Sequence, residues 1–123
     1  MLFRSHTVAR NCSFGMRKKT ALAMALLHKP RVLLLDEPFE GIDPASSAVI
    51  QMLLGQLSRD GVTILLTSHI LSVMQKIATR VVILHEGRVE SDFNPSTTEA
   101  GVEEVYFSIA GKPQPEVPDW LRS

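Results

Sequence analysis

Cysteine, net charge and aromatic residues are all scarce in this sequence. Cys12 is its single cysteine among 123 residues, so no disulfide can form within the chain, and a reducing compartment fits best. Its 13 basic and 13 acidic side chains cancel, which argues against general electrostatic binding to nucleic acid. With 45% hydrophobic and 21% charged residues, however, the chain is not a wholly disordered polymer. Its length suits one domain.

Long hydrophobic runs are also missing. The longest stretches without a charged residue are 44–58 and 61–75, and both are shorter than the roughly 18–20 apolar residues that a membrane span requires. Residues 1–6 contain no apolar block of the kind that a secretion signal needs. We therefore expect neither a membrane-spanning segment nor a secretion signal.

Helical and strand patterns alternate along the chain. Residues 14–28 are rich in helix formers after Ser13, and their second half is apolar on all sides, which predicts a buried helix. Residues 32–35 and 62–67 are continuous apolar runs, typical of parallel strands covered on both faces. Asp43 and Pro44 mark a helix start between them. The apolar stripe expected on that helix consists of Ala45, Ala48, Val49, Met52, Leu53 and Leu57.

The rest of the chain continues the pattern with a hairpin. We expect a helix over 70–78, a β-hairpin over 81–89 that turns at Glu86-Gly87, and a helix over 102–109. Three prolines in residues 113–118 predict an extended tail, with Trp120 as a candidate to pack back onto the protein. The predicted fold class is α/β, with parallel strands, flanking helices and a C-terminal β-hairpin.

Polar residues follow directly after the two predicted parallel strands. They are Asp36 and Glu37 after the first strand and His69 after the second, so all three should share one sheet edge. One carboxylate could support magnesium and the other could orient or deprotonate a water. Taken alone, a turn that ends a buried strand and a structural histidine are the simpler interpretations.

A possible anion site lies at the first predicted helix. Ser13-Phe14-Gly15-Met16 would offer free amides, the positive end of the helix dipole and a hydroxyl. Taken alone, an ordinary helix cap is clearly the better explanation of the same residues.

Four motifs in a fixed order resemble those of the ATP-binding cassette (ABC) ATPases, the nucleotide-binding subunits of ABC transporters. The signature loop corresponds to residues 12–16, Walker B to 32–37, the D-loop to 40–44 and the H-loop to 67–69. Phe14 replaces a glycine of the signature, and Met16 replaces its glutamine. The resemblance implies a partial P-loop NTPase fold of the ABC ATPase type.

The resemblance also implies ligands, roles and partners. ATP and Mg²⁺ would be bound, with Asp36 supporting the metal, Glu37 acting on the attacking water and His69 contacting the γ-phosphate. The residues expected to meet nucleotide between two subunits are Ser13, Phe14, Gly15, Met16 and Asp43. The partners would be a second ABC ATPase subunit and a membrane-spanning transporter subunit, which implies a cytoplasmic location at the inner face of the membrane.

A Walker A loop, Gly-x-x-x-x-Gly-Lys-Ser/Thr, is absent from the sequence. The Gly111-Lys112 pair is followed by Pro113, and Tyr106 stands where the first glycine would be. We therefore expect the C-terminal half of an ABC ATPase domain at residues 12–92, after an unassigned segment at 1–11. Residues 93–112 would be a connector and an amphipathic helix, and 113–123 a proline-rich tail.

Several consequences and alternatives follow from that absence. By itself the chain should bind ATP weakly, should not hydrolyse it, and should be poorly soluble because its strands lack flanking partners. One alternative is a non-catalytic module that donates a signature face to a complete ATPase. Another is a fragment of a DNA-repair-type ABC ATPase, although the long heptad coils of such proteins are not found here.

Overall fold

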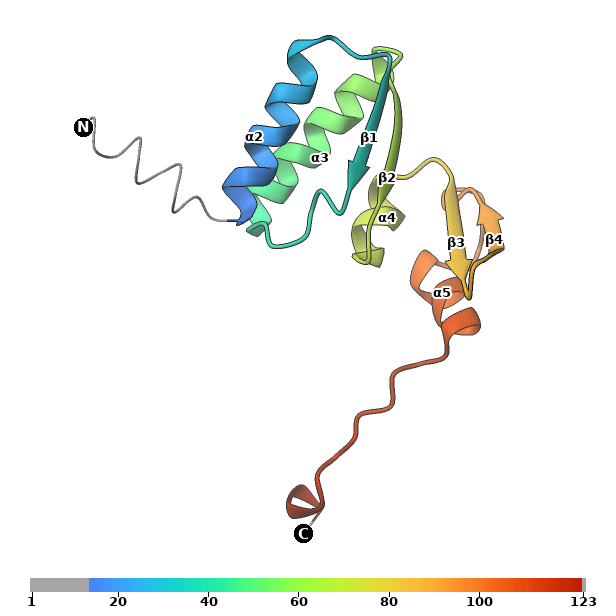
Figure 1. The fold of residues 1–123 in the computed structure, drawn as a ribbon. Helices are drawn as coiled ribbons and strands as arrows, with labels where there is room; N and C mark the ends of the chain where they lie inside the picture. The colour runs from blue at the N-terminus through green and yellow to red at the C-terminus, as the bar shows by residue number, and fades with distance from the viewer. Residues whose placement is uncertain (1–13, 123) are drawn as a thin grey trace, which may run out of the picture. The chain divides into compact units, whose positions relative to one another are not determined.

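The computed structural model describes residues 14–122, which form two compact units that meet in sequence between Ile70 and Leu71. The first unit contains α2 (Phe14–Leu27), β1 (Val32–Asp36), α3 (Pro44–Arg59) and β2 (Thr63–Thr67). The second contains α4 (Leu71–Ile77), β3 (Val81–His85), β4 (Arg88–Phe93), α5 (Val102–Ala110) and the short 3₁₀ helix η1 (Asp119–Leu121). Helices and strands therefore form where the sequence predicts them, except that β4 continues beyond residue 89 and η1 lies within the predicted extended tail, and the α/β class is confirmed (Figure 1).

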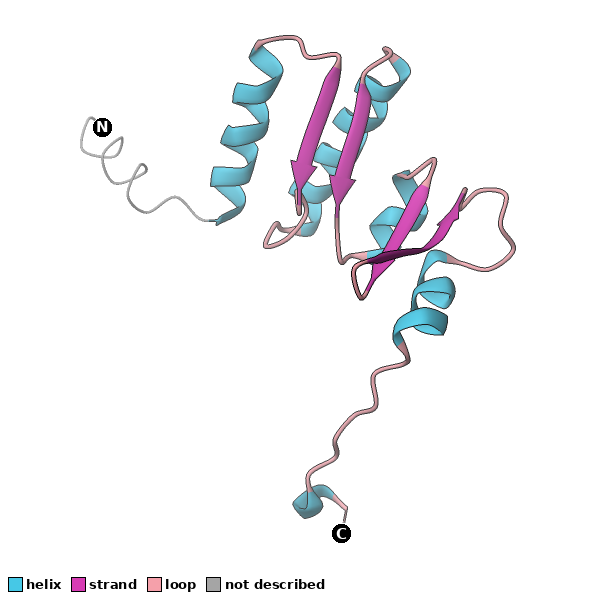
Figure 2. Ribbon diagram, turned by 45° about the vertical axis from the view of Figure 1, so that its right-hand side comes forward, coloured by secondary structure: helices cyan, strands magenta, loops and turns pink. Residues whose placement is uncertain are grey.

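The first unit is built on two parallel strands. β1 and β2 pair in register from Val32 opposite Thr63 to Asp36 opposite Thr67. Figure 2 shows the two strands pointing the same way, with α2 beside β1 and α3 behind the pair. Alternate side chains of β1 face these helices, so Leu33 is buried. The helices contribute Leu22, Ile50 and Leu54 to the same core.

The opposite face of this sheet is open among the described residues. Val32, Leu34 and Leu65 are 58%, 69% and 65% exposed. The prediction of strands covered on both faces is therefore wrong for this part of the chain. The reason is that a continuous apolar run is typical of a strand with both faces buried, whereas the two helices of this unit cover only one face of the sheet.

Two helix faces also differ from the prediction. Met24 and Leu27 of α2 are exposed rather than buried, and in α3 the expected stripe points outward, with Val49 and Met52 exposed. The buried residues of α3 are Ile50 and Leu54 instead. Both helices carry apolar residues on most sides, so periodicity alone does not select the face that meets the sheet.

The second unit is a hairpin packed with two helices. β3 and β4 are antiparallel, with an irregularity in register between Ile83 and Leu84. The predicted turn is confirmed, because Glu86 and Gly87 have φ values of 49° and 75°, as a two-residue hairpin turn requires. Its buried core consists of Met74, Val81, Ile83 and Val102.

Polar contacts tie the second unit together. The Gln75 side chain accepts a hydrogen bond from the Val102 amide at 2.7 Å and donates one to the Pro95 carbonyl at 3.4 Å.

Residues 111–118 have no helix or strand, as the prolines predict. Trp120 is 76% exposed, so the expectation that it could pack back is wrong, because the proline-rich segment holds it in η1 without a covering surface. Across residues 14–122, no helix combines the length and the apolar character that crossing a membrane demands.

Candidate functional site

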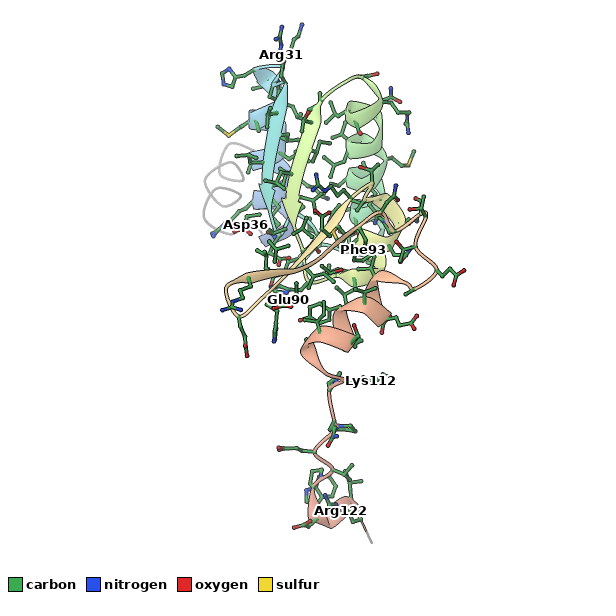
Figure 3. All side chains as sticks on the ribbon, turned by 90° about the vertical axis from the view of Figure 1, so that its right-hand side faces the viewer. Arg31, Asp36, Glu90, Phe93, Lys112 and Arg122 are labelled. Atoms are coloured by element: carbon green, nitrogen blue, oxygen red, sulfur yellow. The ribbon has the colours of Figure 1, made fainter. Side chains whose placement is uncertain are left out.

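The ends of β1 and β2 bring two acidic residues against one threonine. The parallel register places Asp36 opposite Thr67, and Figure 3 shows Asp36 at the far end of β1 from Arg31. The Thr67 hydroxyl donates to Asp36 Oδ1 at 2.5 Å. The backbone amide of Glu37 donates to both the carbonyl and the hydroxyl oxygen of Thr67, each at 3.1 Å. Both carboxylate-bearing residues are thus joined to the neighbouring strand.

Glu37 also holds His69. Its Oε1 lies 3.1 Å from His69 Nε2, and its Oε2 accepts a hydrogen bond from the His69 amide at 3.4 Å. The Glu37 side chain is 18% exposed and that of His69 is 87% exposed. The predicted meeting of Asp36, Glu37 and His69 at one sheet edge is therefore confirmed, with the glutamate enclosed and the imidazole reaching into solvent.

The backbone of Glu37 is unusual. Its φ of 47° lies in the left-handed region, which is uncommon for a residue other than glycine. Such a conformation persists where the surroundings hold it. Here Thr67 holds the amide, and Lys18 Nζ of α2 donates to the Glu37 carbonyl oxygen. Helix α2 therefore contacts the peptide that carries the candidate catalytic carboxylate.

The predicted signature residues lie at the start of α2, apart from Ser13, which falls outside the described residues. Phe14 begins the helix and Met16 is exposed. A Cβ added to Gly15 would lie 3.3 Å from the Gly41 carbonyl oxygen and 3.7 Å from Ile42 Cγ1. A side chain at position 15 would thus crowd the loop before α3, so the close approach of α2 to this loop explains the glycine without a ligand.

Asp43 occupies the start of α3. It has an extended backbone, and Oδ2 accepts a hydrogen bond from the Ser46 amide at 2.9 Å, which confirms the predicted N-cap. The pKa of this carboxyl lies below its ordinary value of 3.8, first through the side-chain hydrogen bond with Ser46 and then through the bond from the Ser46 amide. Asp43 therefore has a structural role that is independent of any nucleotide.

The sequence-predicted residues form two groups in the first unit. Asp36, Glu37 and His69 meet at the strand ends, whereas Gly15 lies against the loop that leads to Asp43. Sequence reasoning missed Lys18 as a contact of Glu37. It placed Thr67 in the H-loop but did not find its link to both acidic residues, although pairing the strand ends would have indicated it.

A magnesium ion suits this arrangement only in part. Across residues 14–122, no three or more His, Cys, Asp or Glu side chains cluster as a metal cage would require. Mg²⁺ commonly uses one or two carboxylates and takes its other ligands from water and phosphate. Asp36, at an exposed strand end beside a groove of ≈ 220 Å³ that Lys18 also lines, fits that pattern. A hollow of ≈ 520 Å³ along α5 contains none of the predicted site residues.

Comparison with known proteins first defines the class. A family model described as "AAA domain, putative AbiEii toxin, Type IV TA system" matches residues 3–75. That match covers more than half of the chain, so the chain belongs to this family of P-loop ATPase domains.

The relatives then narrow the family to the ATP-binding domains of ABC transporters. The chain is 36% identical over 111 residues to the uncharacterized ABC transporter ATP-binding protein YhcH of Bacillus subtilis, which covers 89% of this chain and 36% of that protein. It is 43% identical over 77 residues to the ABC transporter ATP-binding protein NatA of the same organism, covering 63% of this chain and 31% of that protein.

Solved structures agree with this assignment. An ATP-binding subunit of an ABC transporter matches with a TM-score of 0.71 and 30% identity, over 80% of this chain and 44% of that one. A dimeric ATP-binding cassette in a post-hydrolysis state with ADP and Pi matches with a TM-score of 0.62 and 28% identity, over 66% of this chain and 35% of that one. The chain spans about a third of the length of the two curated relatives named above.

Proposed function

We propose that this chain supplies the signature, Walker B, D-loop and H-loop segments of an ABC transporter ATPase that hydrolyses Mg·ATP. The observation that carries the proposal is the junction at the ends of β1 and β2, where Asp36, Glu37 and His69 are held within hydrogen-bonding reach of one another or of Thr67. In the parallel α/β folds, ligands bind at this edge of the sheet.

Each residue of the junction has a distinct proposed role. Glu37 orients the attacking water and accepts its proton, since its carboxylate is enclosed and fixed at both oxygens by His69. His69 contacts the γ-phosphate, because its imidazole extends into solvent while Glu37 holds its position. Asp36 supports Mg²⁺, directly or through a water, and when bound the metal would neutralise charge on the phosphates.

The second group of residues serves the contact between subunits in this proposal. Ser13, Phe14, Gly15 and Met16 meet ATP held by a partner ATPase subunit, and Asp43 lies at the same contact. Phe14, in place of a glycine, brings a bulky side chain to the signature, so we expect backbone amides at the start of α2 to provide the phosphate contacts. The region concerned is residues 12–92, with 93–112 as connector and helix and 113–123 as tail.

The phosphate cradle has to come from a segment other than these 123 residues, which contain no Walker A loop. We infer that the 123-residue polypeptide by itself binds ATP weakly and does not turn it over. The proposed partners are a Walker-A-bearing ATPase subunit and a membrane-spanning transporter subunit, which would place the assembly at the inner face of the membrane.

Titration of the purified chain with Mg·ATP tests the first part of this proposal. We expect no saturation at micromolar nucleotide and no release of phosphate, because the backbone amides and lysine of a Walker A loop are absent. Micromolar affinity with magnesium-dependent hydrolysis by the chain alone would contradict it.

Affinity purification of the tagged chain tests the second part. A Walker-A-bearing ATPase should co-purify, and the assembly should hydrolyse ATP. Glu37→Gln should lower its kcat by about 10²-fold or more while ATP still binds, since general-base catalysis is worth that much. Glu90→Gln, on exposed β4, is the control and should leave kcat unchanged. Turnover unaffected by Glu37→Gln would instead favour a non-catalytic module that donates a signature face.

A further inference from the structure

Thr67 makes three of the hydrogen bonds that define the candidate site. Its hydroxyl lies between the Asp36 carboxylate and the Glu37 backbone amide, at 2.5 Å and 3.1 Å, and its carbonyl oxygen accepts from the same amide. The proposed function gives Thr67 no catalytic or binding role.

The direction of each hydrogen bond follows from the chemistry of the groups. A backbone amide can only donate, so the Thr67 hydroxyl accepts from Glu37. A hydroxyl has one proton, and that proton is therefore available for Asp36 Oδ1. One oxygen atom thus fixes both the rotation of the Asp36 carboxylate and the peptide of Glu37.

The peptide fixed in this way is the one with a left-handed backbone. Glu37 has a φ of 47°, and such a conformation costs free energy that surrounding contacts must offset. Because Thr67 is itself exposed, its hydroxyl adds no buried surface to the core. Its contribution is to the geometry of the two acidic residues rather than to packing.

We propose that Thr67 is a positioning residue that sets the Asp36 carboxylate and the Glu37 peptide together through one hydroxyl. The hydrogen bonds of Thr67 are observed directly. The functional importance of this positioning rests on the proposed function, which gives Asp36 and Glu37 their roles. With Oδ1 engaged by Thr67, the second oxygen of Asp36 is the one that we assign to the metal.

Three substitutions in the full 123-residue chain separate positioning from packing. Thr67→Val removes the hydroxyl while keeping the side-chain shape, and Thr67→Ser keeps the hydroxyl. Thr63→Val is the matched control, since Thr63 is exposed at the other end of the same strand and opposite Val32. Circular dichroism would establish that each variant keeps its helices and strands.

Amide hydrogen exchange at Glu37 is the first measurement. We expect exchange to become several-fold faster in Thr67→Val and to stay within about twofold of the parent in Thr67→Ser and Thr63→Val. The valine removes one of the two hydrogen bonds that this amide donates, and the bond to the carbonyl oxygen of residue 67 remains. Equal protection in Thr67→Val and the parent would overturn the proposal. So would loss of protection in Thr67→Ser, or exchange at the unfolded rate in the parent chain.

Broadening of amide NMR signals by Mn²⁺ alone, without nucleotide, is the second measurement. If Asp36 supports the metal, the signals of residues 36 and 37 broaden in the parent and in Thr67→Ser, and several-fold less in Thr67→Val. Broadening that is equal in Thr67→Val and the parent would overturn the link between the hydroxyl and the metal. No broadening in any variant, with exchange as expected, would support positioning by Thr67 and contradict the metal role in the proposed function.

Discussion

At the scale of single residues, the candidate site depends on how Glu37 is held. Its left-handed backbone, φ 47°, places its amide on Thr67 and its carbonyl toward Lys18. The same residue uses its side chain to hold His69. Backbone and side chain of Glu37 therefore connect three segments that are far apart in sequence.

Lys18 gives the first prediction at this scale. Lys18→Met keeps an unbranched apolar stem but removes the ammonium that donates to the Glu37 carbonyl. We expect the free energy of unfolding to fall by about 1.5–3 kcal/mol, the usual contribution of a hydrogen bond that involves a charged group. Urea unfolding at low protein concentration measures it. Arg17→Met, one residue earlier and exposed, should change it by less than about 0.5 kcal/mol, and equal effects of the two substitutions would argue against the Lys18 contact.

The sequence indicates the types of these residues better than their contacts. Asp36, Glu37 and His69 are predictable because each lies at or just after the end of a strand, and parallel strands end at one edge. Lys18 is not predictable in this way, since its contact depends on where α2 lies against the loop after β1. The close approach of Gly15 to Gly41 is likewise a property of packing that no local pattern encodes.

At the scale of elements, the start of α3 shows how a local signal determines structure. Asp43 caps the helix through Ser46, and Pro44 follows at the first turn. This cap is formed by residues adjacent in sequence, which is why it was predictable. The buried face of the same helix was not, because its contacts depend on the neighbouring strands.

The cap predicts a pH dependence of stability. Hydrogen bonds from Ser46 lower the pKa of Asp43 below 3.8, so the ionised carboxylate stabilises the folded state. That contribution is complete above the unfolded pKa and is lost as pH falls through the lower folded value. Asparagine can cap the helix but does not ionise, so it lacks this pH-dependent contribution. The parent should therefore be more stable than Asp43→Asn near neutral pH, and the difference should vanish in acid.

Urea unfolding of both proteins across the acid range measures this difference. Asp43→Ala is the reference for complete loss of the cap and should be less stable than Asp43→Asn throughout. A difference between parent and Asp43→Asn that does not shrink in acid would show that the carboxylate charge is not its cause.

The hairpin turn gives a second prediction at this scale. Glu86 adopts a φ of 49° before Gly87, and Asn-Gly is a preferred pair for such a turn. Glu86→Asn should raise the free energy of unfolding by about 0.5–1 kcal/mol, since asparagine tolerates the left-handed region better. Thermal unfolding, monitored by a signal from the second unit, measures this change in the free energy of unfolding. Glu90→Asn, within β4 and exposed, should not stabilise the chain, and a gain there would point to charge rather than backbone conformation.

At the scale of the whole molecule, both units bury a small apolar core and leave other apolar strand residues exposed. In the second unit, the hairpin and its helices bury Met74, Val81, Ile83 and Val102, whereas Val82, Leu84 and Val89 of the hairpin are exposed. In the first unit, Val32, Leu34 and Leu65 remain exposed on one sheet face. A continuous apolar strand in the sequence predicts a covering layer but cannot say which segment or polypeptide provides it.

The open sheet face predicts self-association of the 123-residue chain. Leu34 and Leu65 are paired neighbours on it and are 69% and 65% exposed, and exposed apolar strands promote aggregation. The double substitution Leu34→Thr with Leu65→Thr should raise the soluble fraction several-fold and reduce the fluorescence of a bound hydrophobic dye, because threonine keeps strand propensity while adding a polar group.

Leu54→Thr is the matched control, because this leucine is 3% exposed against the same sheet. It should lower the free energy of unfolding by about 2–4 kcal/mol and should not improve solubility. The reason is that it places a polar group in the core and leaves part of the leucine's volume unfilled. A parent chain that stays monomeric at high concentration and melts cooperatively would contradict the prediction. That result would mean that two strands and two helices form a sufficient core, and that the apolar face needs no covering layer for the chain to remain in solution.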